Sequence, residues 1–329
     1  MTIKWGILGA GKIAKKFAED FKVVTNGTIL AVASRSQNRS NEFANEFEIP
    51  EAYSSYEEMV KNSDIDLVYI ATPHNFHLEH VRLCLNNGKS VLCEKPVTVN
   101  SAEFTILQNL AKKKNLFFME ALWTYYLPAI IKAINWIRED KIGEIKQVQV
   151  SFGYTGNMDE KMRLANPDLA GGALLDIGIY GIAMAELVFD EEIEDIQAMA
   201  HFSETGIDDY NSIQLKYKSG GIAQISSSFV SELKNEAVIY GTKGRIEIPQ
   251  FWMAKKAFLI SPDEKLEFIN NELQLGYNHE AFAVNELLKK GAIESSVVPL
   301  IKSKSILSIM DQVRKQIGLK YPFEKQLYE

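Results

Sequence analysis

The first stretch that could do chemistry lies close to the amino terminus. Residues 9–14 read GAGKIA, directly after an apolar run and before a helical one. The first glycine of such a motif allows a tight turn, and the second lets the backbone approach a pyrophosphate. The helix that follows offers oriented backbone amides to the anion. The motif therefore predicts a dinucleotide site formed by Gly9, Gly11, Lys12 and Ile13.

The end of the second expected strand indicates which dinucleotide binds. An NAD site usually has a carboxylate about 20 residues after the glycine motif, whereas this strand ends in Ser34 and Arg35. A guanidinium group can form paired hydrogen bonds with a 2′-phosphate. Arg35, helped by Ser34 and Arg39, therefore favours NADP, with NAD still possible. The alternative is a solvated arginine beside an NAD site.

A second motif, Glu94-Lys95-Pro96, comes directly after an apolar strand. Open α/β sheets bind their ligands at the carboxyl ends of the strands. A lysine is most often a solvated surface residue. Here we expect Lys95 to point at nicotinamide or substrate because of its place at the strand end.

The elements that must position these groups follow from hydrophobic periodicity. Up to about residue 125, short β-branched runs alternate with amphipathic stretches, which predicts βαβ units with right-handed crossovers and an open, doubly wound parallel sheet. The expected strands are residues 4–8, 28–34, 66–71, 90–93 and 116–120, and the expected helices are residues 12–20, 38–47, 55–61, 75–86 and 101–113.

The pattern changes after a predicted helix at residues 128–140. Alternating strands with turn signals such as residues 218–221 predict an antiparallel sheet with hairpins. We therefore expect an α/β protein with a dinucleotide-binding Rossmann domain at residues 1–122 and a substrate-binding and oligomerisation α/β domain at residues 123–329. The strands expected in the second domain are residues 144–154, 211–216, 222–229, 237–239 and 255–260, and its helices are 172–189, 278–290 and 302–317.

Composition excludes several classes of protein. A length of 329 residues suits two domains, and a net charge of -7 argues against nucleic acid as a partner. Cys84 and Cys93 are too few for a disulfide framework, and His77, His80, His201 and His279 lack metal-ligand spacing with a partner carboxylate. We find no apolar run of the ~20 residues that span a bilayer and no targeting segment. The expectations are a cytoplasmic protein, no membrane span and no metal.

The fingerprint and the Glu94-Lys95-Pro96 triplet together resemble the Gfo/Idh/MocA oxidoreductase family. Four further segments are similar to the branch that contains dimeric dihydrodiol dehydrogenase and NADP-dependent D-xylose dehydrogenase: residues 119–124, 171–180, 241–245 and 311–316. This resemblance implies a Rossmann domain joined to an α/β domain with a large, open, mainly antiparallel sheet. It also implies that Glu94, Lys95, Thr72, Pro73 and His77 lie at the cofactor. The loop match is weaker because His74 occupies a position where the family often has asparagine.

The resemblance also assigns the chemistry. Many relatives have a general acid/base histidine where this chain has Tyr180, four residues after Asp176. A phenol with a pKa near 10 is a poor base, but a nearby ammonium can lower that pKa by roughly 1 to 3 units. We expect Lys95 to act as this ammonium, Tyr180 to take the hydroxyl proton, and Asp176 to orient a second substrate hydroxyl. The substrate pocket is expected to include Trp123, Tyr154 and Arg163.

These features predict an NADP-dependent oxidoreductase that moves a hydride between nicotinamide and a hydroxyl-bearing carbon of a small molecule. An aldose, a cyclic polyol and a trans-dihydrodiol all offer such a carbon. One alternative is a catalytically silent sensor of the same fold. Another is an enzyme that recycles bound cofactor between two sugars, although such relatives carry extra amino-terminal sequence. By resemblance, we expect a homodimer or homotetramer formed through the second-domain sheet.

Overall fold

The computed structural model describes residues 2–159 and 162–327. The chain divides into two compact units. The first consists of Met1–Tyr126 and Leu273–Lys304, and the second of Leu127–Glu272 and Ser305–Glu329. Each unit has its own sheet and its own buried core.

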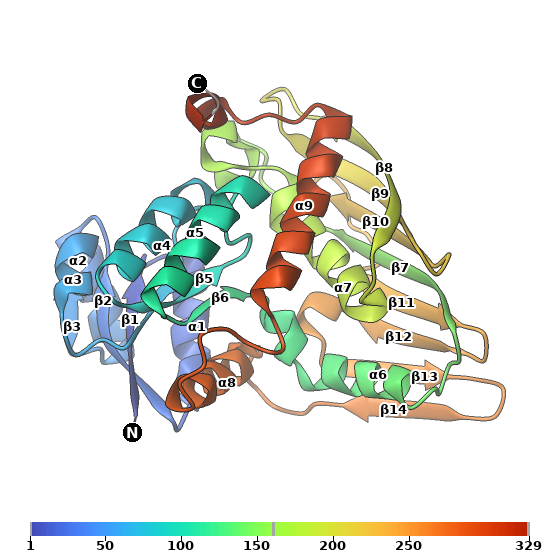
Figure 1. The fold of residues 1–329 in the computed structure, drawn as a ribbon, viewed down its shortest axis with the longest axis horizontal. Helices are drawn as coiled ribbons and strands as arrows, with labels where there is room; N and C mark the ends of the chain where they lie inside the picture. Colours follow the sequence, from blue (N-terminus) through green and yellow to red (C-terminus); the bar gives the residue numbers. More distant parts are fainter. Residues whose placement is uncertain (1, 160–161, 328–329) are drawn as a thin grey trace. The chain divides into compact units, whose positions relative to one another are not determined.

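The first unit is built on a six-stranded parallel sheet with the order β3-β2-β1-β4-β5-β6 (Figure 1). This order confirms the doubly wound Rossmann arrangement, and every strand expected from the sequence is present. The central strands are buried on both faces, as is usual for a parallel sheet covered by helices. The strands are β1 (Ile3–Leu8), β2 (Gly27–Ala33), β3 (Glu51–Tyr53), β4 (Leu67–Ile70), β5 (Ser90–Glu94) and β6 (Phe118–Ala121).

Two helices of this unit begin with a side chain that caps the helix. The Ser55 hydroxyl accepts a hydrogen bond from the Glu58 amide, and the Asn100 side chain accepts one from the Glu103 amide, so both cap amides that have no partner within their own helix. The helices are α1 (Lys12–Phe21), α2 (Gln37–Phe47), α3 (Tyr56–Lys61), α4 (His77–Asn86) and α5 (Ser101–Lys114), with short 3₁₀ turns η1 (His74–Phe76) and η2 (Trp123–Tyr126).

A late segment of the chain returns to this first unit. Helix α8 (Tyr277–Lys289) packs on α1 and on strands β1 and β2. The Asp20 carboxylate accepts hydrogen bonds of 2.7–3.0 Å from three successive amides of residues 275–277, and the Trp5 indole donates to Asn285 at 2.7 Å. The structure therefore differs from the single boundary expected at residues 122/123, because these long-range contacts group residues 273–304 with the first unit.

The second unit is built on an eight-stranded sheet with the order β14-β13-β12-β11-β7-β10-β9-β8 (Figure 1). Strands β7 and β10 pair in parallel and the other neighbours are antiparallel. This arrangement confirms the expected large, mainly antiparallel sheet. Its strands are β7 (Ile145–Gly153), β8 (Ile193–Phe202), β9 (Asp208–Tyr217), β10 (Ile222–Ser228), β11 (Glu236–Gly241), β12 (Arg245–Pro249), β13 (Lys256–Ile260) and β14 (Lys265–Ile269).

Helices cover one face of this sheet. Helix α6 (Pro128–Arg138) packs on β12, β13 and β14, and α7 (Ile179–Phe189) packs on β7 and β10 (Figure 1). Helix α9 (Leu300–Ile317) begins in the first unit, and its residues from Ser305 onward belong to the second. Along β9, buried and exposed residues alternate, as in a sheet with one face packed and one face open.

One stretch of the described chain, Pro167–Phe189, is long and apolar enough to cross a membrane. This stretch is longer than the apolar runs on which the expectation of no membrane span was based. However, 89% of its apolar window is buried inside the protein, as in a core helix. Helix α7, which ends this stretch, packs on the sheet and is buried on nearly all sides. This accounts for its apolar composition without a membrane.

Candidate functional site

The glycine motif forms the turn between β1 and α1. Gly9 has a φ of +104°, and a Cβ there would lie 3.0 Å from the Ala71 carbonyl oxygen and 3.1 Å from the Thr72 methyl carbon, so this position needs glycine. Gly11 differs, because a Cβ there would meet nothing closer than 4.0 Å. The space beside Gly11 is therefore open to a ligand.

Gly11 is also the N-cap residue of α1 and, as a glycine, has no side chain that could cap this helix. Its first amides are left for another acceptor, while the macrodipole favours a negative charge there. Lys12 and Ile13 form the first turn of the helix, with Lys12 exposed. An open cradle at the uncapped start of a ten-residue helix fits the pyrophosphate of a dinucleotide.

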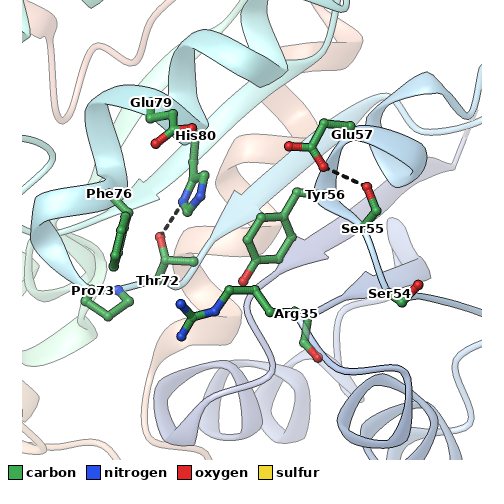
Figure 2. Close-up of a pocket in the computed structure, with 11 residues that line it drawn as sticks. Arg35, Ser54, Ser55, Tyr56, Glu57, Thr72, Pro73, Phe76, Glu79 and His80 are labelled. Atoms are coloured by element: carbon green, nitrogen blue, oxygen red, sulfur yellow. Dashed lines mark hydrogen bonds between the residues drawn. The ribbon is translucent and has the colours of Figure 1, made fainter.

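A pocket of about 380 Å³ lies at the carboxyl ends of β2 and β4 (Figure 2). Four of the residues expected to bind the cofactor line it: Ser34, Arg35, Thr72 and Pro73. The other lining residues are Ser54, Ser55, Tyr56, Glu57, Phe76, Glu79 and His80, none of which the sequence reasoning assigned to the cofactor. The structure therefore brings together two loops that lie about forty residues apart in the chain.

Aromatic rings form much of the wall of this pocket. The Tyr56 ring meets the His80 imidazole edge to face, with ring centroids 4.9 Å apart, and His80 stacks on Phe76 at 5.8 Å. The Arg35 guanidinium lies 6.0 Å from the centre of the Phe76 ring. Figure 2 shows the Tyr56 ring between His80 and Arg35. Flat apolar walls with one cation suit a heteroaromatic base joined to an anionic group.

The positive charge in this pocket comes from arginine and not from histidine. Burial, followed by the neighbouring His77, lowers the pKa of His80 to about 4, so its ring is neutral at physiological pH. Arg35 and Arg39 both lower the pKa of Tyr56, although burial raises it overall, so both arginines act near this wall. Glu57 and Glu79 add carboxylates, and Glu57 accepts a hydrogen bond from Ser55 at 2.6 Å.

The Ser34 hydroxyl stabilises the turn that carries Arg35. It donates to the Ser36 carbonyl oxygen at 2.7 Å and accepts a hydrogen bond from the Ser36 amide, and the Ser40 hydroxyl oxygen lies 3.1 Å from it. Ser40 in turn donates to the Tyr53 carbonyl oxygen at 2.6 Å, which ties α2 to β3. This network fixes where β2 ends and therefore where the Arg35 side chain starts.

His77 links the two loops that follow β4 and β5. Its Nδ1 lies 2.8 Å from the Pro96 carbonyl oxygen and its Nε2 lies 2.8 Å from the Thr72 carbonyl oxygen, and the ring is fully buried. His77 was expected at the cofactor. These contacts let it hold Thr72 close to the turn that carries Lys95.

Glu94 and Lys95 lie at the carboxyl end of β5, as the sequence predicts. The Glu94 carboxylate is buried and accepts a hydrogen bond from the Tyr69 hydroxyl on the neighbouring strand β4. Lys95 is partly exposed at the start of the following turn. It is close enough to Glu120 that its charge lowers the pKa of that carboxyl group.

In the second unit, Asp176 lies in a π-helical turn, η5 (Leu174–Gly178), that leads into α7. Such wide turns often occur at functional sites. One Arg163 amino group donates to the Asp176 carboxylate at 3.0 Å, and the other is buried without a partner among the described residues. Arg163, which was expected in the substrate pocket, is thus paired with Asp176.

Tyr180 is nearly buried in the first turn of α7. Its ring lies 5.9 Å from that of Phe152, which stacks on Trp252 at 3.8 Å. The ring centroids of Tyr154 and Phe152 are 6.3 Å apart. Burial and the Asp176 charge raise the pKa of Tyr154 to about 12, so it stays a neutral hydrogen-bonding phenol.

The helical segment that carries Asp176 and Tyr180 is anchored at its start. The buried Asp208 carboxylate accepts hydrogen bonds of 2.8 Å from the Leu174 amide and from Asn211. Gly172 has a φ of +114°, and a Cβ there would lie 2.3 Å from an Asp208 carboxylate oxygen. Glycine is therefore required for the close approach that fixes this segment.

Trp123 lies in the first unit, in the 3₁₀ turn after β6. It is nearly buried, and one face of its indole stacks on the Tyr277 ring with centroids 4.3 Å apart. The predicted substrate residues therefore fall into two groups, with Trp123 in the first unit and Tyr154, Arg163 and Asp176 in the second. Among the described residues, no group of three or more His, Cys, Asp or Glu side chains could hold a metal ion.

Comparison with known proteins agrees with this arrangement. The oxidoreductase family with an NAD-binding Rossmann fold matches residues 3–122, and the Gfo/Idh/MocA C-terminal domain matches residues 130–247. The trans-1,2-dihydrobenzene-1,2-diol dehydrogenase of Mus musculus is 37% identical over 99% of this chain and 100% of its own length. The enzyme of that name from Homo sapiens is 34% identical over the same shares.

Solved structures share the fold at lower identity. A levoglucosan dehydrogenase in complex with NADH and levoglucosan has a TM-score of 0.88 at 18% identity and covers 97% of each chain. A 3-ketoreductase from Actinomadura kijaniata in complex with NADP has a TM-score of 0.87 at 23% identity, covering 96% of this chain and 98% of its own.

The glycine turn, the parallel sheet and these full-length matches define an NAD(P)-dependent oxidoreductase. The chain belongs to the Gfo/Idh/MocA family.

Proposed function

We propose that this protein uses NADP to oxidise or reduce a hydroxyl-bearing carbon of an aldose, a cyclic polyol or a trans-dihydrodiol. The observation that carries this proposal is the pairing of Arg163 with Asp176 beside Tyr154 and near Tyr180. This group combines a carboxylate, a guanidinium and phenols, which can bind neighbouring hydroxyls. The names of the relatives point to the same substrate classes.

When bound, the nicotinamide supplies the group that accepts or donates the hydride. The residues that would hold the cofactor are Gly9, Gly11, Lys12 and Ile13 at the pyrophosphate, Ser34, Arg35 and Arg39 at the 2′-phosphate, and Thr72, Pro73, His77, Glu94 and Lys95 along the sheet edge. Arg35 supports NADP because it lines an aromatic pocket in which the histidine, His80, is neutral. Glu57 and Glu79 favour NAD as the alternative, because their carboxylates can accept hydrogen bonds from ribose hydroxyls.

Three residues are assigned to the chemistry. Tyr180 takes the proton of the substrate hydroxyl during oxidation and returns it during reduction. Lys95, as an ammonium, lowers the pKa of this phenol so that it can act near neutral pH. Asp176, held by Arg163, accepts a hydrogen bond from a second hydroxyl and orients the reacting carbon. Trp123 and Tyr154 supply flat apolar surface for the carbon face of a ring.

A substrate panel tests this function directly. The purified protein is mixed with NADP⁺ or NAD⁺ and a set of aldoses, inositols and trans-dihydrodiols, and reduced nicotinamide is followed by its absorbance. We expect turnover with at least one secondary alcohol or hemiacetal and a preference for NADP⁺. If the compounds bind, as seen by calorimetry, and no cofactor is consumed in either direction, the protein is a sensor and the proposal is wrong.

We further propose that the protein is a homodimer or homotetramer that associates through the open face of its eight-stranded sheet. On β8 and β9 this face presents Met199, which is 81% exposed, and the stacked pair His201 and Tyr210, with ring centroids 5.0 Å apart. Exposed apolar residues on an open sheet mark an association surface. Scattering in solution should give at least twice the chain mass, and Met199→Glu should lower it. A monomer mass for the unaltered protein contradicts this proposal.

We also place the protein in the cytoplasm. Cys84 and Cys93 support this location because both are buried, unpaired thiols, as is usual in a reducing compartment.

A further inference from the structure

Three glutamates are buried in the first unit near the turn that carries Lys95. Glu94 ends β5, Glu120 lies in β6, and Glu280 lies in the first turn of α8. Glu120 and Glu280 have no exposed surface at all. Carboxylates are very rarely fully buried without a charged partner, so this cluster requires an explanation.

The contacts of Glu120 tie it to the turn that begins with Lys95. One carboxylate oxygen accepts a hydrogen bond of 2.9 Å from the Val97 amide, two residues after Lys95. The other oxygen is buried and has no hydrogen-bond partner among the described residues. Glu280 differs, because neither of its oxygens has a partner there. Of the two, only Glu120 holds the backbone of this turn, and the Ser303 hydroxyl and the Lys95 charge also act on its carboxylate.

The two carboxyl groups respond differently to this environment. Burial, together with the charges of Glu94 and Glu120, raises the pKa of Glu280 well above its usual range, which favours the uncharged form of this carboxyl group. Burial also raises the pKa of Glu120 to about 7, where Ser303, the Val97 amide and the Lys95 charge limit the increase. Glu120 therefore changes charge in the physiological range.

The groups that face Glu120 come from several elements. Glu94 and Cys93 lie on β5, Lys95 and the Val97 amide on the turn, Ser303 on α9 and Glu280 on α8. Burial, reinforced by these carboxylates, keeps the pKa of Cys93 far above its usual value, so this thiol adds no charge. Among the charges found to act on Glu120, the one that favours its ionised form is Lys95.

We propose that Glu120 is a positioning residue for Lys95: one oxygen holds the turn that carries the lysine, and the negative charge of the ionised carboxylate balances the lysine ammonium. When Glu120 is ionised, its negative charge neutralises part of the Lys95 charge. Less positive charge then acts on the Tyr180 phenol. When Glu120 is protonated, the full ammonium charge acts on that phenol. This inference rests on the role proposed above for Lys95.

The first test observes Lys95 in the cofactor-free protein. Lysines are methylated reductively with ¹³C-formaldehyde, and the Lys95 signal is assigned with the Lys95→Arg variant. Between pH 5 and pH 9 the Lys95 methyl resonance should shift with a midpoint near 7, the pKa of Glu120. In Glu120→Gln that transition should disappear. In Glu280→Gln, the matched control in the same cluster, it should remain because neither Glu280 oxygen forms a hydrogen bond to this turn among the described residues.

The second test measures turnover against pH for a substrate identified by the panel. For alcohol oxidation, the midpoint of kcat/KM should move to lower pH by about one unit in Glu120→Gln, because an unbalanced ammonium lowers the phenol pKa further. Glu280→Gln should keep the midpoint of the unaltered protein. A purely structural role for Glu120 would instead lower kcat equally at every pH.

The two proposals fail in different ways. A Lys95 transition that persists unchanged in Glu120→Gln overturns the positioning role and leaves the proposed function intact. Full turnover in Lys95→Met overturns the catalytic role of Lys95 whatever the resonance does. If Glu120→Gln does not fold, Glu120→Asp keeps the carboxylate but shortens its reach, so its Lys95 midpoint should move; an unmoved midpoint contradicts the inference.

Discussion

Replacing Tyr180 with phenylalanine is expected to lower kcat by roughly 10²- to 10⁴-fold, the usual contribution of a positioned general acid or base. The change removes only the hydroxyl oxygen. The ring stays packed near Phe152, so the fold should be unaffected. Because the glycine turn and the Arg35 pocket are formed by other residues, the dissociation constant of NADPH should stay within about twofold. Steady-state kinetics and fluorescence titration of NADPH measure these two quantities.

The matched control is Tyr210→Phe, which also removes one phenolic oxygen from the second unit. Tyr210 is 46% exposed on the open face of the sheet and stacks on His201. Its loss should leave kcat and KM unchanged. Wild-type turnover in Tyr180→Phe would mean that another group handles the proton, and a fall of similar size in both variants would point to a general effect on the fold.

The second large effect is expected for Arg35→Ala. A hydrogen bond to a charged group contributes about 1.5–3 kcal/mol, so loss of the guanidinium should weaken NADPH binding by roughly 10- to 100-fold. Binding of NADH, which lacks the 2′-phosphate, should change little. The preference for NADPH over NADH should therefore largely disappear, as measured by KM for each cofactor and by calorimetry. Higher salt should reduce the advantage of the unaltered protein, because Arg35 is exposed.

Arg82→Ala is the matched control, since Arg82 is an exposed arginine on α4 of the same unit and does not line the pocket. Its cofactor preference should equal that of the unaltered protein. If the protein binds NADH more tightly than NADPH, and this preference is unchanged in Arg35→Ala, then Glu57 or Glu79 binds an unphosphorylated ribose.

Local sequence patterns were sufficient for the first sheet and for the start of the cofactor site. The strand, the GAGKIA turn and α1 are adjacent in the chain, so their geometry follows from short-range rules. Strands buried on both faces contain continuous apolar runs, and this made β1, β4, β5, β6 and the buried second half of β2 recognisable. The three-residue β3 was missed because it is too short to show a period.

In the second unit, the strands β8, β12 and β14 were also missed. Strand β14 alternates polar and apolar residues but is only five residues long and has no fully buried residue, and β8 has only one buried residue, so the apolar signal is weak in both. Strand β12 is only five residues long. Their identity as strands depends on hydrogen bonds to neighbours in the sheet, which a single segment does not encode.

The Arg35 pocket shows where sequence reasoning reached its limit. Ser34 and Arg35 were found because they occupy a known distance from the glycine motif. Tyr56, Phe76 and His80 were not, because an aromatic residue before or inside a helix is most often part of the core. The one available signal was that Phe76 and His80 follow Thr72-Pro73, the loop already expected to face the cofactor.

The sequence by itself determined the class of fold, the dinucleotide fingerprint and the residue types suited to hydride-transfer chemistry, because each depends on spacing along a single stretch of chain. Only the tertiary structure decided that α8 joins the first unit, that Arg163 pairs with Asp176, and that Glu280 is buried in the cluster of glutamates around Glu120. These relations join residues up to about 280 positions apart. They depend on burial and on the pairing of polar groups in a shared interior, which periodicity along the chain does not specify.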